Sequence, residues 1–229
     1  MRILAAGAHP DDIEIFMFGL LSLFKFRGDQ ITMLVATDGS LGGKLKKEEV
    51  TRLREIETTD ALKGLGDLFF LKLPDGSLGD YESHKIKIKK KVLEISPDLI
   101  ITHAPNDYHS DHQALSGIMK SIACHQVPLI YSDTMLGVNF LPNYYVDISK
   151  VFESKKLAVS KHISQQPERF LDLIEVMNSF RSAQCNHPKG NYAEAYLINN
   201  NFPFTEIRGL LPSAIKVLPF LNSEKKGFL

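Results

Sequence analysis

The chain has 229 residues, of which 44% are hydrophobic, and its 27 Lys and Arg side chains balance its 27 Asp and Glu side chains. This length can bury one sizeable core or at most two small ones. A net charge of zero gives no electrostatic reason to expect a nucleic acid or a membrane surface as partner. The two cysteines, Cys124 and Cys185, are far apart and form no CxxC motif, so we expect no disulfide framework and a reducing, cytoplasmic location.

The first residues read as a strand rather than as the apolar segment of a signal peptide. The most apolar early stretch, residues 13–24, has only about 12 residues, which is too short to span a bilayer and suits a buried helix. We therefore expect no stable membrane insertion.

Apolar runs of strand length alternate with longer stretches of helical periodicity. In chain order, the expected elements are a strand (2–7), a helix (13–27), a strand (31–36), a helix (48–63), a strand (68–73), a helix (84–95), a strand (98–102), a helix (112–124), two strands (129–132 and 144–148) and two helices (152–162 and 169–185). Gly28 is expected to end the first helix as its C-terminal cap.

This alternation is typical of βαβ units and predicts an α/β fold: a single Rossmann-like, three-layer domain with a mainly parallel sheet, spanning residues 1–229. Residues from about 203 to 229 lose the pattern and are expected to form a C-terminal arm or flap. In a doubly wound sheet of strand order 3-2-1-4, the first and fourth strands are neighbours and their connections leave on opposite faces. We therefore expect the active site at the carboxyl ends of these strands.

Two short polar clusters follow these two strands. The first has the sequence AHPDDIE at residues 8–14, and the second has the sequence HAPNDYHSDH at residues 103–112. Each brings imidazoles and carboxylates to the point where a strand ends, so the clusters converge if the strands are neighbours. Together they offer three metal ligands and further acid and base groups, which favours a catalytic over a structural metal site.

The candidate metal ligands are His9, Asp12 and His112. Imidazoles and a carboxylate suit zinc, and three protein ligands leave a fourth position for a water molecule whose pKa falls towards about 7. Other divalent metals could occupy such ligands in vitro. A second carboxylate beside a ligand can take the proton of that water, and a further imidazole can protonate the leaving group. From spacing alone, an equally good interpretation is that His9 and the adjacent aspartates cap a helix.

Three features beside these ligands have more modest interpretations. His103 is expected to pack behind the site rather than to bind the metal, and Asp111 is suited to hold an imidazole in one tautomer. The glycine-rich loop at residues 39–44 lacks the GxxxxGK[ST] spacing of a phosphate-binding loop, so we expect it to border the crevice.

Through its two polar motifs, the chain resembles the PIG-L/LmbE-like family of zinc-dependent N-acetylglucosaminide deacetylases, whose signatures read roughly AHPDD(I/E)E and HPxDxHxDH. The similarity extends to about residue 200. The resemblance implies that the three candidate ligands bind zinc and that Asp11 is the general base. It also implies that His109 is the general acid or oxyanion stabiliser and that Asp111 orients it.

Relatives contact their sugar substrates with an arginine near the start of the second helix. Arg52 matches the R-x-x-E spacing best and is the candidate for substrate binding, with Arg54 as the alternative. The chain departs from the family at two places that affect the pocket. Bulky residues at 15–18 replace a glycine-rich helix start, and Tyr108 stands where some relatives have arginine.

The leading hypothesis is a zinc-dependent hydrolase that removes the acetyl group from the amide nitrogen of a small, soluble N-acetylglucosamine-type sugar conjugate. It would act on linear amides, which contain carbon–nitrogen bonds other than peptide bonds. The resemblance also implies a homo-oligomer. Two alternatives stay open: a metal-binding Rossmann-like protein that acts on another amide, and a non-catalytic sugar-binding relative. A dinucleotide-dependent enzyme is disfavoured, because no GxGxxG follows the first strand and the paired carboxylates would repel a pyrophosphate.

Overall fold

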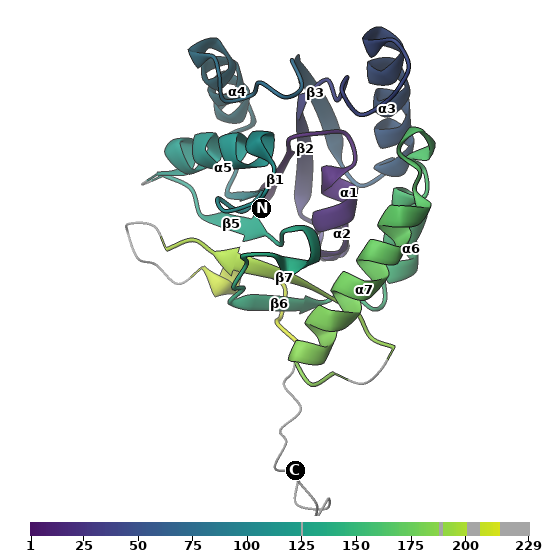
Figure 1. Ribbon diagram of the computed structural model, residues 1–229. Helices are drawn as coiled ribbons and strands as arrows, with labels where there is room; N and C mark the ends of the chain where they lie inside the picture. Colours follow the sequence, from purple (N-terminus) through teal and green to yellow (C-terminus); the bar gives the residue numbers. More distant parts are fainter. Residues whose placement is uncertain (125, 188–189, 201–206, 216–229) are drawn as a thin grey trace, which may run out of the picture.

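The central strands are short apolar runs, such as RILAAG in β1 (Arg2–Gly7) and LIIT in β4 (Leu99–Thr102), and all of their residues except Arg2 are buried. Parallel strands of this composition need helices on both faces of the sheet. The computed structural model shows this arrangement (Figure 1). It describes residues 1–124, 126–187, 190–200 and 207–215.

The other strands are β2 (Gln30–Thr37), β3 (Asp67–Leu73), β5 (Leu129–Ser132), β6 (Tyr144–Asp147) and β7 (Ala193–Ile198). The helices are α1 (Asp12–Phe16), α2 (Phe18–Arg27), α3 (Lys47–Ala61), α4 (Glu82–Ile95), α5 (Ser110–Ala123), α6 (Phe152–Val159) and α7 (Glu168–Gln184). Within the described residues, single 3-10 turns are η1 (Met135–Gly137), η2 (Ile163–Gln165) and η3 (Arg208–Leu210).

The strands form one sheet in the order β3-β2-β1-β4-β5-β7-β6, which confirms the predicted order of the first four. All pairings from β3 to β5 are parallel, and only β7 runs antiparallel, to both β5 and β6. The α/β fold class is therefore confirmed. The prediction missed β7, because its sequence AEAYLI places a charged residue, Glu194, inside a buried run.

Helices α1, α2, α3, α6 and α7 cover one face of the sheet, and α4 and α5 cover the other (Figure 1). Each interface has its own apolar cluster. The first cluster includes Ile13, Phe24 and Phe152, and the second includes Ile88 and Leu115. The connection after β1 thus leaves on one face and the connection after β4 on the other, as a crevice at the strand ends requires.

The helix predicted at 13–27 is divided at Met17, whose φ of −132° lies outside the helical range. The buried Glu194 carboxylate accepts hydrogen bonds from the backbone N–H groups of Gly19 and Leu20, both at 2.8 Å. It also accepts from Lys155 Nζ at 2.8 Å and from the Tyr196 hydroxyl at 2.6 Å. Glu194 therefore satisfies the first free N–H groups of α2 from a distant strand.

Part of the predicted C-terminal arm packs against the body of the protein. Ile207 and Leu211 are buried in the first apolar cluster, and the N–H of Ile215 donates to the carbonyl of Tyr145. Residues 203–206 and 216–229 of that arm lie outside the described residues.

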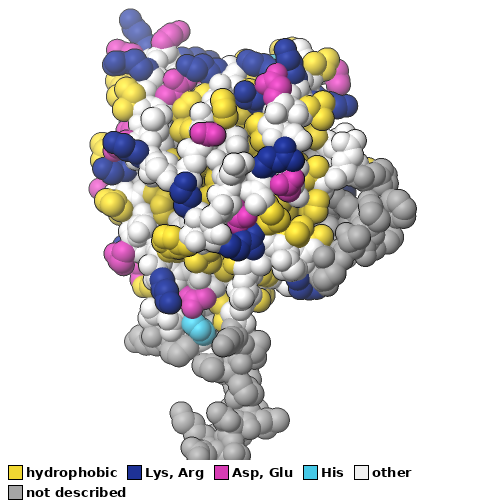
Figure 2. Space-filling view, turned by 180° about the vertical axis from the view of Figure 1, so that it is seen from behind, with side chains coloured by type: hydrophobic (Ala, Val, Ile, Leu, Met, Phe, Trp, Pro, Cys, Tyr) yellow, Lys and Arg dark blue, Asp and Glu magenta, His cyan; other side chains and the backbone are white. Residues whose placement is uncertain are grey.

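Charged side chains are mixed over the face shown in Figure 2, where Lys and Arg alternate with Asp and Glu rather than gathering in one basic area. Among the residues that the structure describes, none of the helices combines the length and the apolar character needed to cross a membrane.

Candidate metal centre and active site

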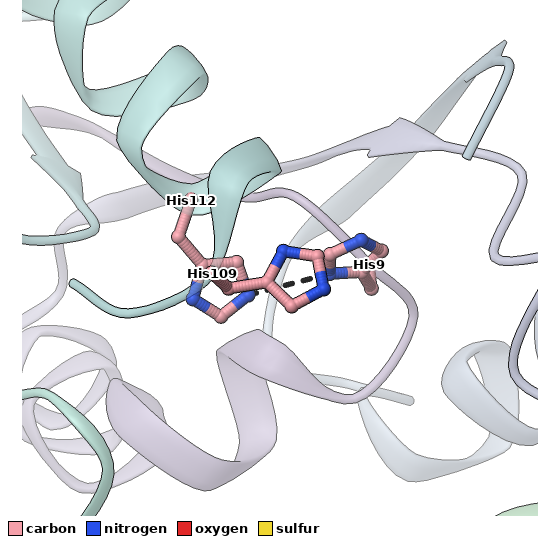
Figure 3. A group of neighbouring side chains, drawn as sticks. All are labelled: His9, His109 and His112. Carbon is pink, nitrogen blue, oxygen red and sulfur yellow. Dashed lines mark hydrogen bonds between the residues drawn. The ribbon is translucent and has the colours of Figure 1, made fainter. Parts of the chain in front are cut away.

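The two polar clusters meet at the carboxyl edge of the sheet, because β1 and β4 are parallel neighbours. His9 lies in the loop after β1, and Asp12 begins α1. His109 and His112 lie at the start of α5, after β4, and reach across to His9 (Figure 3). The structure thus brings together side chains that are separated by about a hundred positions, as the predicted strand order requires.

Three of these side chains form a triangle of potential ligand atoms. His9 Nδ1 lies 3.3 Å from His112 Nε2 and 3.4 Å from Asp12 Oδ2, and His112 Nε2 lies 3.2 Å from Asp12 Oδ1. In a tetrahedral zinc site, bonds of about 2.0–2.1 Å place neighbouring ligand atoms about 3.3–3.4 Å apart. The spacing and donor types of these buried side chains therefore fit a zinc ion.

Other groupings of neighbouring residues could also hold a metal ion, and they add His103, His109, Asp75 and Asp111 to members of the triangle. These side chains have further partners. His103 Nε2 accepts from the Ala8 N–H at 3.0 Å, and His109 Nδ1 accepts from the Asp111 N–H at 3.2 Å. The triangle has such partners too, because Asp12 Oδ2 accepts from the His9 N–H at 2.6 Å and lies 3.1 Å from His103 Nε2. The geometry therefore allows each of these ligand sets.

Carboxylates lie behind both imidazoles of the triangle. His112 Nδ1 lies 3.1 Å from Asp107 Oδ2, and His9 Nε2 lies 3.1 Å from Asp75 Oδ1 and 3.3 Å from Asp111 Oδ2. A carboxylate at the far nitrogen is typical of imidazoles that bind a metal, because it orients the ring and raises its basicity. Neither Asp107 nor Asp75 was predicted as a site residue, although Asp107 lies inside the second motif and Asp75 in a Pro-Asp-Gly turn.

The side chain of Asp111 lies beside His9, whereas its backbone contacts His109. Its carboxylate accepts from the backbone N–H groups of Gly76 and Leu78, at 2.8 and 3.0 Å, and contacts His9. Its link to His109 is made by its backbone N–H, which donates to His109 Nδ1. Asp111 therefore holds His109 through the main chain and His9 through the side chain.

Asp11 stands beside the triangle without belonging to it. Its φ of 121° is a strained conformation for a residue with a side chain, at a cost of about 1–3 kcal/mol. Burial raises the pKa of its carboxyl group, and the guanidinium of Arg54, 3.0 Å away, opposes this rise only in part. Arg54 also donates to the carbonyls of Pro10 and Gly39. It thereby joins the loop after β1 to the glycine-rich loop after β2.

The structure does not bring Arg52 to the site. Arg52 is exposed, whereas Arg54 is buried and lines the pocket. The reason is helical geometry, because positions two residues apart on α3 point about 200° apart around the axis. The expectation of an arginine at the site therefore applies to Arg54, and the choice of Arg52 is corrected.

The buried imidazoles of the triangle are surrounded by carboxylates. Burial disfavours a charged imidazole, yet the carboxylates raise the pKa of His9 to about 12 and that of His112 to about 9. Burial opposes ionisation of Asp111 too, but His9 and two backbone N–H groups lower its pKa to about 2. The cluster therefore has an excess of negative charge that a cation would balance. His109 differs, because burial and its two histidine neighbours lower its pKa.

The site opens into a pocket of about 380 Å³. Apart from the acidic and imidazole groups, its wall contains apolar, amide and basic side chains: Ile15, Phe16, Leu41, Met135, Phe170, Tyr108, Gln165 and Arg169. Leu41 and Gly42 confirm that the glycine-rich loop borders the crevice. A Cβ atom at Gly42 would lie 2.4 Å from Arg54 Nη1, so this close approach requires glycine. A larger hollow of about 670 Å³ lies where the strands begin and contains none of the predicted site residues.

Comparison with known proteins identifies the family of this chain. Residues 4–123 match the family model described as PIG-L, GlcNAc-PI de-N-acetylase. A diacetylchitobiose deacetylase of Thermococcus kodakarensis is 26% identical over 196 residues, which cover 76% of this chain and 73% of the relative.

Two solved structures show the same fold. The N,N'-diacetylchitobiose deacetylase of Pyrococcus horikoshii aligns with a TM-score of 0.75 and 21% identity, over 86% of this chain and 83% of its own. GalB, a 4-carboxy-2-hydroxymuconate hydratase of Pseudomonas putida, aligns with a TM-score of 0.75 and 16% identity, over 95% of this chain and 99% of its own. Since one of the two is a hydratase, the fold alone does not determine the reaction.

Proposed function

We propose that the chain removes the acetyl group from a small N-acetylglucosamine-type sugar conjugate. The premise is that the chain belongs to the PIG-L family and is a deacetylase that acts on carbon–nitrogen bonds other than peptide bonds. The observation that carries the proposal is the triangle of His9, Asp12 and His112, with Asp11 and His109 beside it. A site with three protein ligands and two adjacent proton-transfer groups suits the hydrolysis of an amide.

His9, Asp12 and His112 would hold a divalent metal, with zinc the first candidate on donor type and spacing. When bound, the metal would supply hydroxide at neutral pH and polarise the carbonyl group of the amide. Asp75, Asp107 and Asp111 would keep the two imidazoles in the tautomers that direct His9 Nδ1 and His112 Nε2 to it.

Asp11 would act as the general base. Its carboxylate lies next to the ligand set, and burial raises its pKa, which makes it a better proton acceptor. Arg54 fixes its position through an ion pair and two backbone contacts. Arg54 is therefore a positioning residue in this scheme, since its hydrogen bonds are directed at the protein.

His109 would act on the substrate. Because its Nδ1 accepts from the Asp111 N–H, the ring proton lies on Nε2. Its lowered pKa keeps the ring neutral near pH 7, as a hydrogen-bond donor to the amide oxygen requires. The same Nε2 proton can pass to the leaving nitrogen when the carbon–nitrogen bond breaks, with acetate and a free amine as products.

The direct test incubates N-acetylglucosamine conjugates with metal-loaded protein and measures the amounts of acetate and of free amine that are released. We expect equal amounts of the two products and loss of turnover when the metal is removed with a chelator. Metal-loaded protein that binds these sugars without releasing acetate would refute deacetylation and favour the non-catalytic alternative. Acetate release only from other amides would favour the second alternative. A homo-oligomer and a cytoplasmic location are further proposals from the sequence.

A further inference from the structure

The first turn of α7 brings a cation to the mouth of the pocket. Arg169 and Phe170 both line it, and the Arg169 guanidinium lies over the Phe170 ring, 4.5 Å from its centre. Arg169 is exposed, whereas Phe170 is half-buried. The aromatic ring therefore supports the guanidinium at the boundary between the pocket and solvent.

Arg169 makes no ion pair with any residue in the described part of the chain, unlike Arg54, whose guanidinium is paired with Asp11. Helix stability does not explain its position either. A cation in the first turn of a helix opposes the helix dipole, and α7 is 17 residues long. Within the described residues, the Arg169 guanidinium is therefore not neutralised by a carboxylate and stays accessible at the mouth of the pocket.

The segment before Arg169 is held rigidly. The Glu57 carboxylate accepts from the N–H and the hydroxyl of Ser164, at 2.7 and 2.6 Å. Gln165 Nε2 donates to the carbonyl of Gly42 at 2.8 Å and contacts Ser164 Oγ at 3.2 Å. Because these bonds use Nε2, Gln165 Oε1 remains as an acceptor for a hydroxyl group in the pocket.

The size of the pocket limits how far the bound molecule extends. A volume of about 380 Å³ is near the lower end of the ~300–1,000 Å³ typical of small-molecule sites. It suits one sugar ring with a compact substituent. The carboxylates in its wall, Asp11, Asp12 and Asp75, lie among cationic or imidazole partners deep in the site, so Arg169 offers the accessible charge at its mouth.

We propose that Arg169 and Phe170 form a subsite for an oxyanion, a carboxylate or phosphate, that is carried by the amino sugar next to its ring. Gln165 Oε1 accepts a hydrogen bond from a hydroxyl group of that ring, and Phe170 packs against the apolar face of the ring. This inference rests on the proposed deacetylation. It predicts that the substrate is an acidic N-acetylglucosamine conjugate rather than a neutral one. Guanidinium groups bind both oxyanions through two parallel hydrogen bonds.

The test compares three N-acetylglucosamine substrates on metal-loaded protein: a neutral methyl glycoside, a glycoside with a carboxylate aglycone and the 1-phosphate. We expect Arg169→Gln to lower kcat/KM for the better anionic substrate about 10- to 100-fold, mainly through KM, because a charge-assisted bond is lost. The methyl glycoside should change by less than about twofold. The ratio between the two anionic substrates distinguishes carboxylate from phosphate.

Two variants make the result specific. Arg169→Lys should recover part of the preference, because it restores the charge without the planar fork. Lys161→Gln, which removes a cation that pairs with Asp60 and does not line the pocket, should leave the preference unchanged. Equal losses on neutral and anionic substrates in Arg169→Gln, or a wild type without preference for either anion, would overturn the subsite.

Failure of the deacetylation itself gives a different pattern. If the wild type hydrolyses none of the three substrates, the proposed function fails. The subsite is then tested by calorimetry, which measures binding of the same sugars to the wild type and to Arg169→Gln. Weaker binding of only the anionic sugars to Arg169→Gln supports it, and equal binding of all three to both proteins refutes it.

Discussion

Asp11→Asn removes the proposed base and leaves the adjacent metal ligand in place. Asn keeps the shape of the side chain and tolerates a positive φ better than most residues, which matters at a φ of 121°. Its amide oxygen can still accept from Arg54, which retains the carbonyls of Pro10 and Gly39 as acceptors. We therefore expect a folded variant that binds its metal normally.

The expected loss of activity is large compared with the loss of stability. A general base contributes about 10²–10⁴-fold to the rate, which is roughly 3–5 kcal/mol of the barrier. Breaking a buried ion pair costs about 3–5 kcal/mol when one charge is left without partners. Because Arg54 keeps three acceptors in Asp11→Asn, the loss of stability should be below about 3 kcal/mol.

The assay measures kcat on one substrate and the metal content of the same protein preparation. Asp12→Ala is the matched comparison, since it removes a corner of the ligand triangle and should lose metal and activity together. A metal-free Asp11→Asn beside a metal-loaded Asp12→Ala would reverse the two roles. An Asp11→Asn rate close to that of the wild type would refute Asp11 as the base.

Three further changes test other parts of the site and the fold. His109→Ala should keep its metal and lose about 10²–10⁴-fold in kcat, and a metal-free variant would instead make His109 a ligand. Glu194→Gln leaves Lys155 buried without a counter-ion and should lower the free energy of unfolding by about 3–5 kcal/mol. Calorimetry should show a fall of roughly 10 °C in Tm, whereas Glu82→Gln, at an exposed position, should leave Tm unchanged. In metal-free protein, the pKa of His112 is raised from an unfolded value of 6.5 to about 9, so its stabilisation is complete below pH 6.5 and is lost as the pH rises through 9. Thermal melts of stripped protein should therefore show Tm falling from pH 7 to 9, and a Tm that rises over this range would contradict the charge balance derived for the cluster.

The central sheet and the two polar motifs could be predicted because their signals are local. Apolar runs such as RILAAG mark buried strands, and each motif lies directly at a strand end. Only the strand order was then needed to bring His9 and His112 together. β7 could not be predicted in this way, because Glu194 is tolerated in its buried run only through Lys155, Tyr196 and the start of α2.

Side chains whose position depends on tertiary contacts were harder to predict. Arg52 and Arg54 lie on the same helix, and the motif spacing favoured Arg52, but the rotation of α3 against the glycine-rich loop buries Arg54. Asp75 reads as an ordinary turn residue until β3 brings that turn beside His9. In both cases the sequence contains the residue type, and only the packing of one element on another shows its use.

The reaction and the substrate of this protein are inferred from different parts of the chain, the reaction from local motifs and the substrate from tertiary packing. The family match covers residues 4–123, which include every residue proposed for metal binding and proton transfer. Gln165, Arg169 and Phe170 lie outside that range, on a segment that reaches the pocket through η2 and the first turn of α7. The chemistry can therefore be inferred from the motifs, whereas the group that the amino sugar carries has to be inferred from the wall that these later residues build. Relatives that share both motifs are accordingly expected to differ in substrate wherever this segment differs.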